Sequence, residues 1–122
     1  MRKGALDLEL KRLYYDNKVR TRYILPQKSI AEGLNLKYDD TYLNYHNNIC
    51  PRCRKEMTVK NGNVKNIGAI GAGILQTTGY YYPYAVCKEC SVDMEKSSRK
   101  HNEEKSSEIE EYVGKVIPHL AP

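Results

Sequence analysis

The sequence predicts a small α+β domain with a β-hairpin core and flanking helices, and three observations predict it. Two C-x-x-C pairs use all four cysteines of the 122-residue chain. A hairpin signal follows the first pair, because Asn61-Gly62 adopts the positive φ angles of a type I′ turn at little cost. After Cys90 the composition becomes charged and helical. The length fits one such domain, and we expect no large catalytic cleft in a chain this short.

The two cysteine pairs indicate a metal site. Cys50 and Cys53 form the first pair, and Cys87 and Cys90 form the second. This spacing lets two sulfurs from one tight turn reach the same ion, and zinc prefers four thiolate or imidazole ligands in a tetrahedron. We therefore expect one structural Zn2+ bound by all four cysteines, with no open position for a catalytic water. His46 precedes the first pair and could replace a ligand, although an ordinary exposed histidine fits its position better.

Other uses of four cysteines fit less well. Two disulfides belong to an oxidising compartment. The chain has no apolar stretch of about 18 residues that could span a bilayer, and its basic start leads into acidic residues rather than an apolar signal segment, so we expect a cytoplasmic protein. A redox C-x-x-C is typical of a βαβ context with one pair. Iron–sulfur clusters usually take cysteines at other spacings.

In the order of these motifs the sequence resembles the zinc-ribbon and treble-clef groups of four-cysteine zinc fingers, over residues 50–90 and more loosely over 91–105. A treble clef runs from a knuckle through a hairpin to a second C-x-x-C that opens a helix, whereas a ribbon places that pair in another knuckle. The helical composition after Cys90 favours the treble clef and leaves the ribbon open. Treble-clef nucleases of the His-Asn-His type carry a metal-binding histidine between or beside the pairs. No histidine lies between Cys53 and Cys87, so we expect no enzyme.

Weaker patterns describe the N-terminal third of the chain. Within residues 5–15, Leu6, Leu10 and Leu13 fit one helical face and favour a helix, although Leu6, Leu8 and Leu10 also alternate as in a strand. Residues 18–25 alternate β-formers with basic residues and stop at Pro26, which predicts an edge strand with a basic face. Residues 29–32 match a capping box at the start of a short helix that Gly33 soon ends.

Two further segments flank the second pair. Residues 80–86 predict a strand that enters Cys87 directly, and residues 91–117 predict helices. Residues 68–73 are rich in glycine but lack the Lys-Ser/Thr of a phosphate-binding loop, so we interpret them as a flexible or tightly packed loop.

Charge and motif order divide the chain into three parts. We expect a basic N-terminal segment, residues 1–28, that packs on the core. A single zinc-binding domain follows over residues 29–117, with its four-cysteine core in 50–90, and residues 118–122 form a tail. The formal net charge is +5, and residues 1–28 alone hold eight Lys/Arg against three Asp/Glu.

This uneven charge favours a nucleic-acid partner. In that interpretation basic side chains neutralise phosphates and exposed tyrosines stack on bases. The candidate residues are Arg2, Lys3, Lys11, Arg12, Lys18, Arg20, Arg22, Arg52, Arg54, Lys55, Tyr80, Tyr82 and Tyr84. The alternative is a small protein-binding inhibitor, immunity or adaptor protein of bacterial or phage origin, acting through a tyrosine-rich surface. A homodimer is possible, and a tyrosine-lined surface buried in it would favour the protein-binding interpretation. The tyrosines could equally fill a core that has no Phe or Trp.

Overall fold

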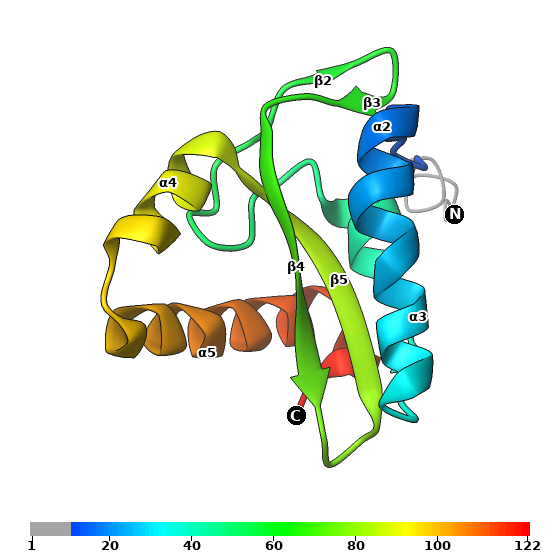
Figure 1. Ribbon diagram of the computed structural model, residues 1–122, viewed down its shortest axis with the longest axis vertical. Coiled ribbons are helices and arrows are strands. Elements are labelled where there is room, and N and C mark those ends of the chain that lie inside the picture. The colour runs from blue at the N-terminus through cyan, green and yellow to red at the C-terminus, as the bar shows by residue number, and fades with distance from the viewer. Residues whose placement is uncertain (1–10) are drawn as a thin grey trace, which may run out of the picture.

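The computed structural model describes residues 11–122 and places a three-stranded sheet between two groups of helices (Figure 1). The sheet order is β1-β5-β4, in which β5 pairs with β1 in parallel and with β4 in antiparallel orientation. A second, two-stranded sheet joins β2 and β3. The strands are β1 (Lys37–Tyr38), β2 (Val59–Lys60), β3 (Asn63–Val64), β4 (Ile67–Leu75) and β5 (Tyr80–Cys87). The predicted small α+β class is confirmed.

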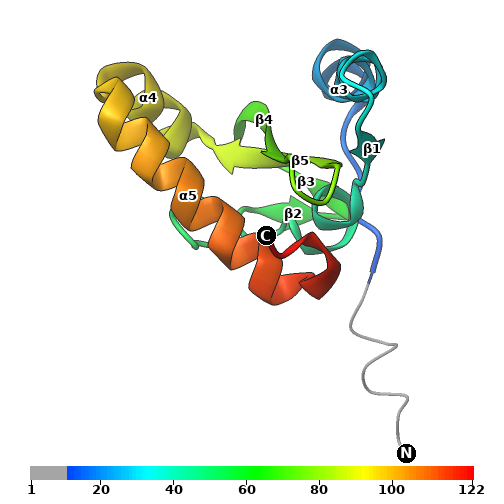
Figure 2. The same cartoon turned by 90° about the horizontal axis from the view of Figure 1, so that it is seen from below.

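Residues 17–33 form a helix on one side of the sheet, so the predicted basic edge strand is wrong (Figure 2). It consists of α2 (Asn17–Val19), a π-helical stretch (Arg20–Ile24) and α3 (Leu25–Gly33). Its start is capped by Asp16, whose carboxylate accepts a hydrogen bond from the Val19 amide at 3.0 Å. The boundary expected after residue 28 falls inside α3, and the capping box expected at residues 29–32 lies within the same helix.

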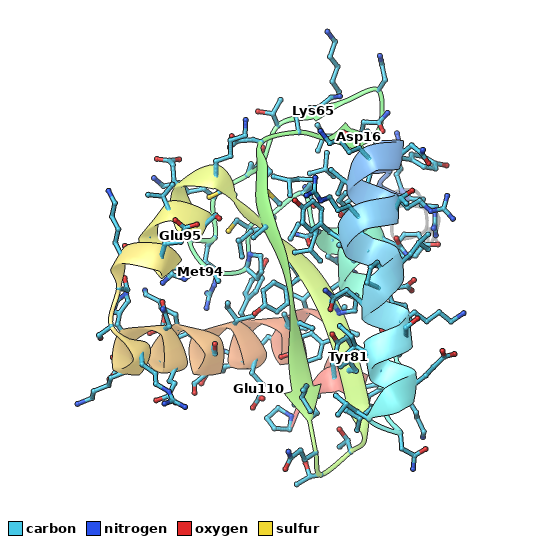
Figure 3. All side chains as sticks on the ribbon, viewed as in Figure 1. Asp16, Lys65, Tyr81, Met94, Glu95 and Glu110 are labelled. Carbon is cyan, nitrogen blue, oxygen red and sulfur yellow. The ribbon has the colours of Figure 1, made fainter. Side chains whose placement is uncertain are left out.

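Tertiary contacts explain why this segment is helical. Ile24, Gln27 and Ala31 recur at helical spacing, and all three are at least partly buried. The Tyr81 hydroxyl, on the side of β5 that faces α3 in Figure 3, donates a hydrogen bond to the Gln27 side chain. Burial of this helical face against the sheet therefore decides the conformation, although the alternating β-formers favour a strand.

The tight turn between β2 and β3 matches the predicted type I′ hairpin, with φ values of 52° at Asn61 and 79° at Gly62. Tyr14 adds to this sheet, since its amide donates to the Gly62 carbonyl at 2.8 Å. Of the helix predicted over residues 5–15, the part up to residue 10 lies outside the described residues, as do Arg2 and Lys3. Residues 11–15 are extended, because their backbone pairs with β3 and with the Asn44 carbonyl.

The glycine-rich residues 68–73 belong to strand β4 and are not a loop. Gly73 pairs with Tyr82 across the hairpin, and a Cβ atom at Gly73 would lie 2.1 Å from the tyrosine ring. Gly71 faces Tyr84 in the same way, with the ring 3.5 Å from its Cβ position. The glycines therefore make room for tyrosine side chains.

The other group of helices consists of α4 (Lys88–Lys96) and α5 (Arg99–Val116), which confirms the helices predicted after Cys90. The α5 helix buries Ile109 and Val113 in the same core as Tyr82. Residues 118–120 form a 3-10 turn, and Leu120 is fully buried, so the expected tail contributes to the core. Within the part of the chain that the structure describes, no helix has the length and apolar character needed to cross a bilayer.

Candidate metal centre

The first cysteine pair lies in a closed knuckle. The Arg54 amide donates to the Cys50 carbonyl at 2.7 Å, and the Cys50 amide donates to the Lys55 carbonyl at 2.9 Å. An antiparallel bridge between Ile49 and Glu56 closes the base of the loop. Arg54 has a φ of 67°, a left-handed conformation that reverses the chain directly after Cys53. The knuckle therefore presents two sulfurs on one side of a tight turn.

The second pair lies where β5 passes into α4. Cys87 is the last residue of β5 and the N-cap of α4, and its sulfur accepts a hydrogen bond from the Cys90 amide at 3.4 Å. Gly68 on β4 permits this junction, because a Cβ atom there would lie 2.6 Å from the Cys87 carbonyl oxygen and 2.8 Å from the Lys88 Cα. The start of α4 thus lies directly against the β4 backbone.

The four sulfurs meet in one cluster with the geometry of a four-coordinate metal site. All four Sγ atoms lie within 4.8 Å of one another. The Cys50–Cys90 and Cys53–Cys87 Sγ distances are 3.7 and 3.8 Å. A tetrahedral ion with Zn–S bonds of about 2.3 Å places its sulfurs about 3.8 Å apart. The cysteines are free thiols rather than disulfides, and they can hold one metal ion. His46 is not part of this cluster.

The pKa shifts of the thiols bear on whether all four cysteines can be thiolates at once. Burial raises the pKa of Cys50, and burial together with the nearby sulfurs raises the pKa of Cys90. Burial also acts on Cys53, but hydrogen bonds from the Lys55 amide and the other cysteines outweigh it and lower the Cys53 pKa. Four thiolates so close together repel one another, so full deprotonation requires a cation at their centre.

Asn47 holds the two halves of the site in register. Its side chain, which is fully buried, donates a hydrogen bond to the Ala85 carbonyl at 3.0 Å and accepts one from the Ala85 amide. The same amide group contacts the Ile49 carbonyl at 3.1 Å, next to Cys50. This link between the knuckle and β5 has no signature in the sequence beyond an asparagine three residues before the cysteine.

Arg52 was expected to face solvent and bind phosphate, but it is buried. Its side chain is 5% exposed, and its guanidinium donates to the Asp93 carboxylate at 2.6 Å and to the Asn102 side-chain oxygen at 3.0 Å and lies beside the Cys90 sulfur. These contacts join the knuckle to α4 and α5 and place a positive charge near the thiols. Arg52 is therefore a structural residue beside the four-cysteine cluster and is not free to bind phosphate.

Two other knuckle residues keep their exposure. The Arg54 guanidinium lies 4.3 Å from the centre of the Tyr112 ring, a cation–π contact with α5. Lys55 is exposed. Both line an open cavity of about 610 Å³ beside Cys53, together with Glu89 and other charged residues of both signs. The mixed charge gives this surface no clear preference for an anion.

The tyrosines of β5 are core residues, which corrects their assignment as base-stacking side chains. Tyr82 is 1% and Tyr84 9% exposed, and Tyr81 is also buried. Tyr80 is partly buried, with its ring packed edge-on against His119 at 5.6 Å. The β5 strand is covered on both faces, so the expectation of one exposed tyrosine face fails.

The remaining candidates come from residues 11–12 and from the helix of residues 17–33, which lies across the sheet from α4 and α5 (Figure 1). The exposed residues are Lys11, Arg12, Lys18, Arg20 and Arg22, and Lys28 joins them. Lys18 lies in α2, Arg20 and Arg22 in the π-helical stretch, and Lys28 in α3. Among the described residues none of these six forms an ion pair with a carboxylate.

Comparison of the chain with protein-family models, with curated proteins and with solved structures finds no match. The interpretation of the site therefore depends on its own geometry.

Proposed function

We propose that the four cysteines hold one structural zinc ion in a treble-clef arrangement. The order of elements supports this: a knuckle carries Cys50 and Cys53, the β4–β5 hairpin follows, and the second pair opens α4. Four thiolates fill a tetrahedral shell and leave no site for substrate or water, which favours a binding module over an enzyme. The metal stabilises a domain whose largest buried side chains include two tyrosines, Tyr42 and Tyr82.

The zinc-stabilised domain binds nucleic acid through the basic surface, which comprises Lys11, Arg12, Lys18, Arg20, Arg22 and Lys28. The observation that carries this proposal is the concentration of six exposed, unpaired cations against the single carboxylate of Asp16 within residues 11–28. Cations on a helix can follow a phosphate backbone, and counterion release then favours association at any nucleotide sequence. The surface is separate from the metal centre, so zinc acts through folding and makes no contact with the ligand.

The test is fluorescence anisotropy of the zinc-loaded full chain with labelled single- and double-stranded oligonucleotides. Binding should weaken steeply between about 50 and 200 mM salt. The double variant K18Q/R22Q should reduce the slope of log K against log salt by about one to two. The matched control, R99Q/K100Q on α5, changes the net charge equally and should leave the slope unchanged. Salt-independent binding, or equal losses in both variants, would contradict the proposal.

A second candidate function is supported by the free edge of β4. The Tyr81 carbonyl accepts from Asp39, and both backbone groups of Ala85 bond to Asn47, so the groups of β5 at these positions point away from β4. Their partners Ile74 and Ile70 must therefore direct N–H and C=O toward the open edge. Residues 67–75 contain no charge and no proline, and natural edges usually carry such blocks. A protein partner can add a strand here, in the simplest case β4 of a second copy.

Analytical ultracentrifugation tests this alternative. A concentration-dependent dimer that I74K abolishes, while V59K on β2 preserves it, would support strand pairing at β4. Ile74 and Val59 are both substantially exposed, so neither lysine need disturb the core. A monomer at all concentrations would contradict pairing between the β4 strands of two copies.

A further inference from the structure

A cavity of about 240 Å³ lies within the basic surface, between residues 12–15, the helix from Arg20 to Lys28, and residues 38–44. It is separate from the metal centre, since no cysteine lines it. Ligand pockets that fully enclose a drug-sized molecule usually measure about 300–1,000 Å³. This cavity therefore fits one small unit that stays partly open to solvent.

The charge of the cavity favours an anion. Arg12, Arg20 and Lys28 line it, against the single carboxylate of Asp40. All three cations are exposed, and none has a carboxylate partner among the residues from 11 to 122. Guanidinium groups bind phosphate oxygens through two parallel hydrogen bonds, which a carboxylate-paired arginine could not offer as freely.

The cavity also offers a flat aromatic surface. Tyr14 lines it and is 53% exposed, and the Cβ position of Gly62 lies 3.2 Å from a carbon on one edge of its ring. The β2–β3 turn therefore contacts the ring while much of the side chain stays open to solvent. Tyr38 lines the same cavity. Exposed tyrosine rings beside cations are the usual stacking platforms for nucleobases.

Asn44 gives an independent indication of a ligand. It lines the cavity and is only 8% exposed. Its backbone is fully used, because its carbonyl accepts from the Leu13 amide at 2.6 Å and its amide donates to the Asp40 carbonyl at 2.9 Å. Its side-chain amide has no hydrogen-bond partner in the described part of the chain. Buried polar groups are rarely left unpaired, and a carboxamide can pair with the donor and acceptor edge of a base.

We propose that this cavity binds one nucleotide unit. Arg12, Arg20 and Lys28 hold its phosphate, Tyr14 stacks on its base, and the Asn44 carboxamide pairs with the base edge. The ligand class rests on the proposed nucleic-acid function, in which the nucleotide is one unit of a strand. A free nucleotide has the same chemistry, and the experiment separates the two sources.

Isothermal titration calorimetry of the zinc-loaded full chain with AMP, UMP and inorganic phosphate tests the site, in parallel with anisotropy on a short single-stranded oligonucleotide. We expect the nucleotides to bind more tightly than phosphate. R20Q should weaken nucleotide binding by about tenfold or more, as loss of a charged hydrogen bond requires. The matched control R99Q, on α5, should have no effect. Y14L should remove the advantage of nucleotides over phosphate, and so should N44L if that variant keeps its fold by circular dichroism.

The outcomes separate this inference from the proposed function. Nucleotides that bind no better than phosphate, or a loss in R20Q no larger than in R99Q, would overturn the inference even if oligonucleotides bind. Oligonucleotide binding that is lost in Y14L and retained in R99Q supports a strand unit in the cavity. Nucleotide binding with no oligonucleotide binding would overturn the proposed function and assign the cavity to a free nucleotide.

Discussion

The side-chain amide of Asn47 pairs with both backbone groups of Ala85, as a neighbouring strand would. Strand β1 ends its pairing with β5 at Tyr81, so β5 continues beyond its partner toward Cys87. Pro83, which has no N–H to donate, occupies part of this uncovered stretch. One asparagine thus completes the β5 edge just before the metal centre.

Replacing Asn47 by alanine should therefore destabilise the domain strongly. The variant leaves the buried N–H and C=O of Ala85 without partners, which should lower the free energy of unfolding by about 2–4 kcal/mol. Urea denaturation of the zinc-loaded protein measures this loss. N48A, at the exposed neighbouring position, should change stability by less than about 0.5 kcal/mol. Equal effects of the two substitutions would contradict the role assigned to Asn47.

Replacing Arg52 even by lysine, which preserves the charge, should destabilise the domain. Lysine cannot reach Asp93 and Asn102 together, because it lacks the planar fork of the guanidinium. R52K should lower the melting temperature and speed the loss of zinc to a chelator. The control R54K retains a cation above Tyr112 and should have a smaller effect on both measurements. A melting temperature unchanged in R52K would show that the buried contacts do not hold the knuckle in place.

Gly68 should tolerate no side chain, since a Cβ atom there meets the backbone of Cys87 and Lys88. Forcing the start of α4 away from β4 should cost about 1–3 kcal/mol and weaken zinc binding. The comparison is G33A, at the end of α3, where nothing lies within 4 Å of the added methyl group. Thermal unfolding and competition with a zinc-binding dye check both variants. The account requires a clear loss in G68A alone.

A carboxylate–imidazole contact predicts part of the pH dependence of stability. His119 lies 2.6 Å from Asp39. Burial opposes ionisation of Asp39, but hydrogen bonds with His119 and Thr41 outweigh it and lower the Asp39 pKa. A carboxylate whose pKa is lowered in the folded state stabilises the fold at pH values above its ordinary pKa of about 3.9. This stabilisation is lost as the pH falls through the lower pKa of the folded state.

D39N should consequently be less stable than the wild type near neutral pH, and the difference should shrink as the solution becomes more acidic than about pH 4. Comparing the two proteins at each pH cancels any loss of metal that both share. A difference that stays constant down to acidic pH would show that ionised Asp39 does not contribute to stability.

The four-cysteine cluster was predictable because much of its information is local. A C-x-x-C spacing brings two sulfurs together within one turn, and the Asn61-Gly62 turn fixes its hairpin through backbone preferences alone. The four sulfurs then meet as the spacing predicts. The helices after Cys90 follow equally from local composition and from caps such as Ser98, whose hydroxyl accepts from the His101 amide.

The errors arose where distant contacts decide the structure. Residues 18–25 carry β-formers, yet they are helical because the fold partly buries Ile24 against the core and pairs Gln27 with Tyr81 of β5. Tyr82 and Tyr84 are buried because α5 covers their face of the hairpin. The glycine content of β4 is typical of a loop, and only the tyrosine rings opposite the glycines explain it in a strand. Asn44 and Asn47 could not be distinguished from their exposed neighbours without the burial that the fold gives them.

Native mass spectrometry of the protein purified without added metal tests the central claim most directly. The account predicts a folded chain carrying one zinc ion. Its mass should equal the chain plus one zinc, less the protons that the thiols lose on binding. Removal of that ion by a chelator should shift the protein to the broad, high charge states of an unfolded chain. A folded protein that carries no metal, with all four cysteines reduced, would contradict the claim that zinc holds this domain together.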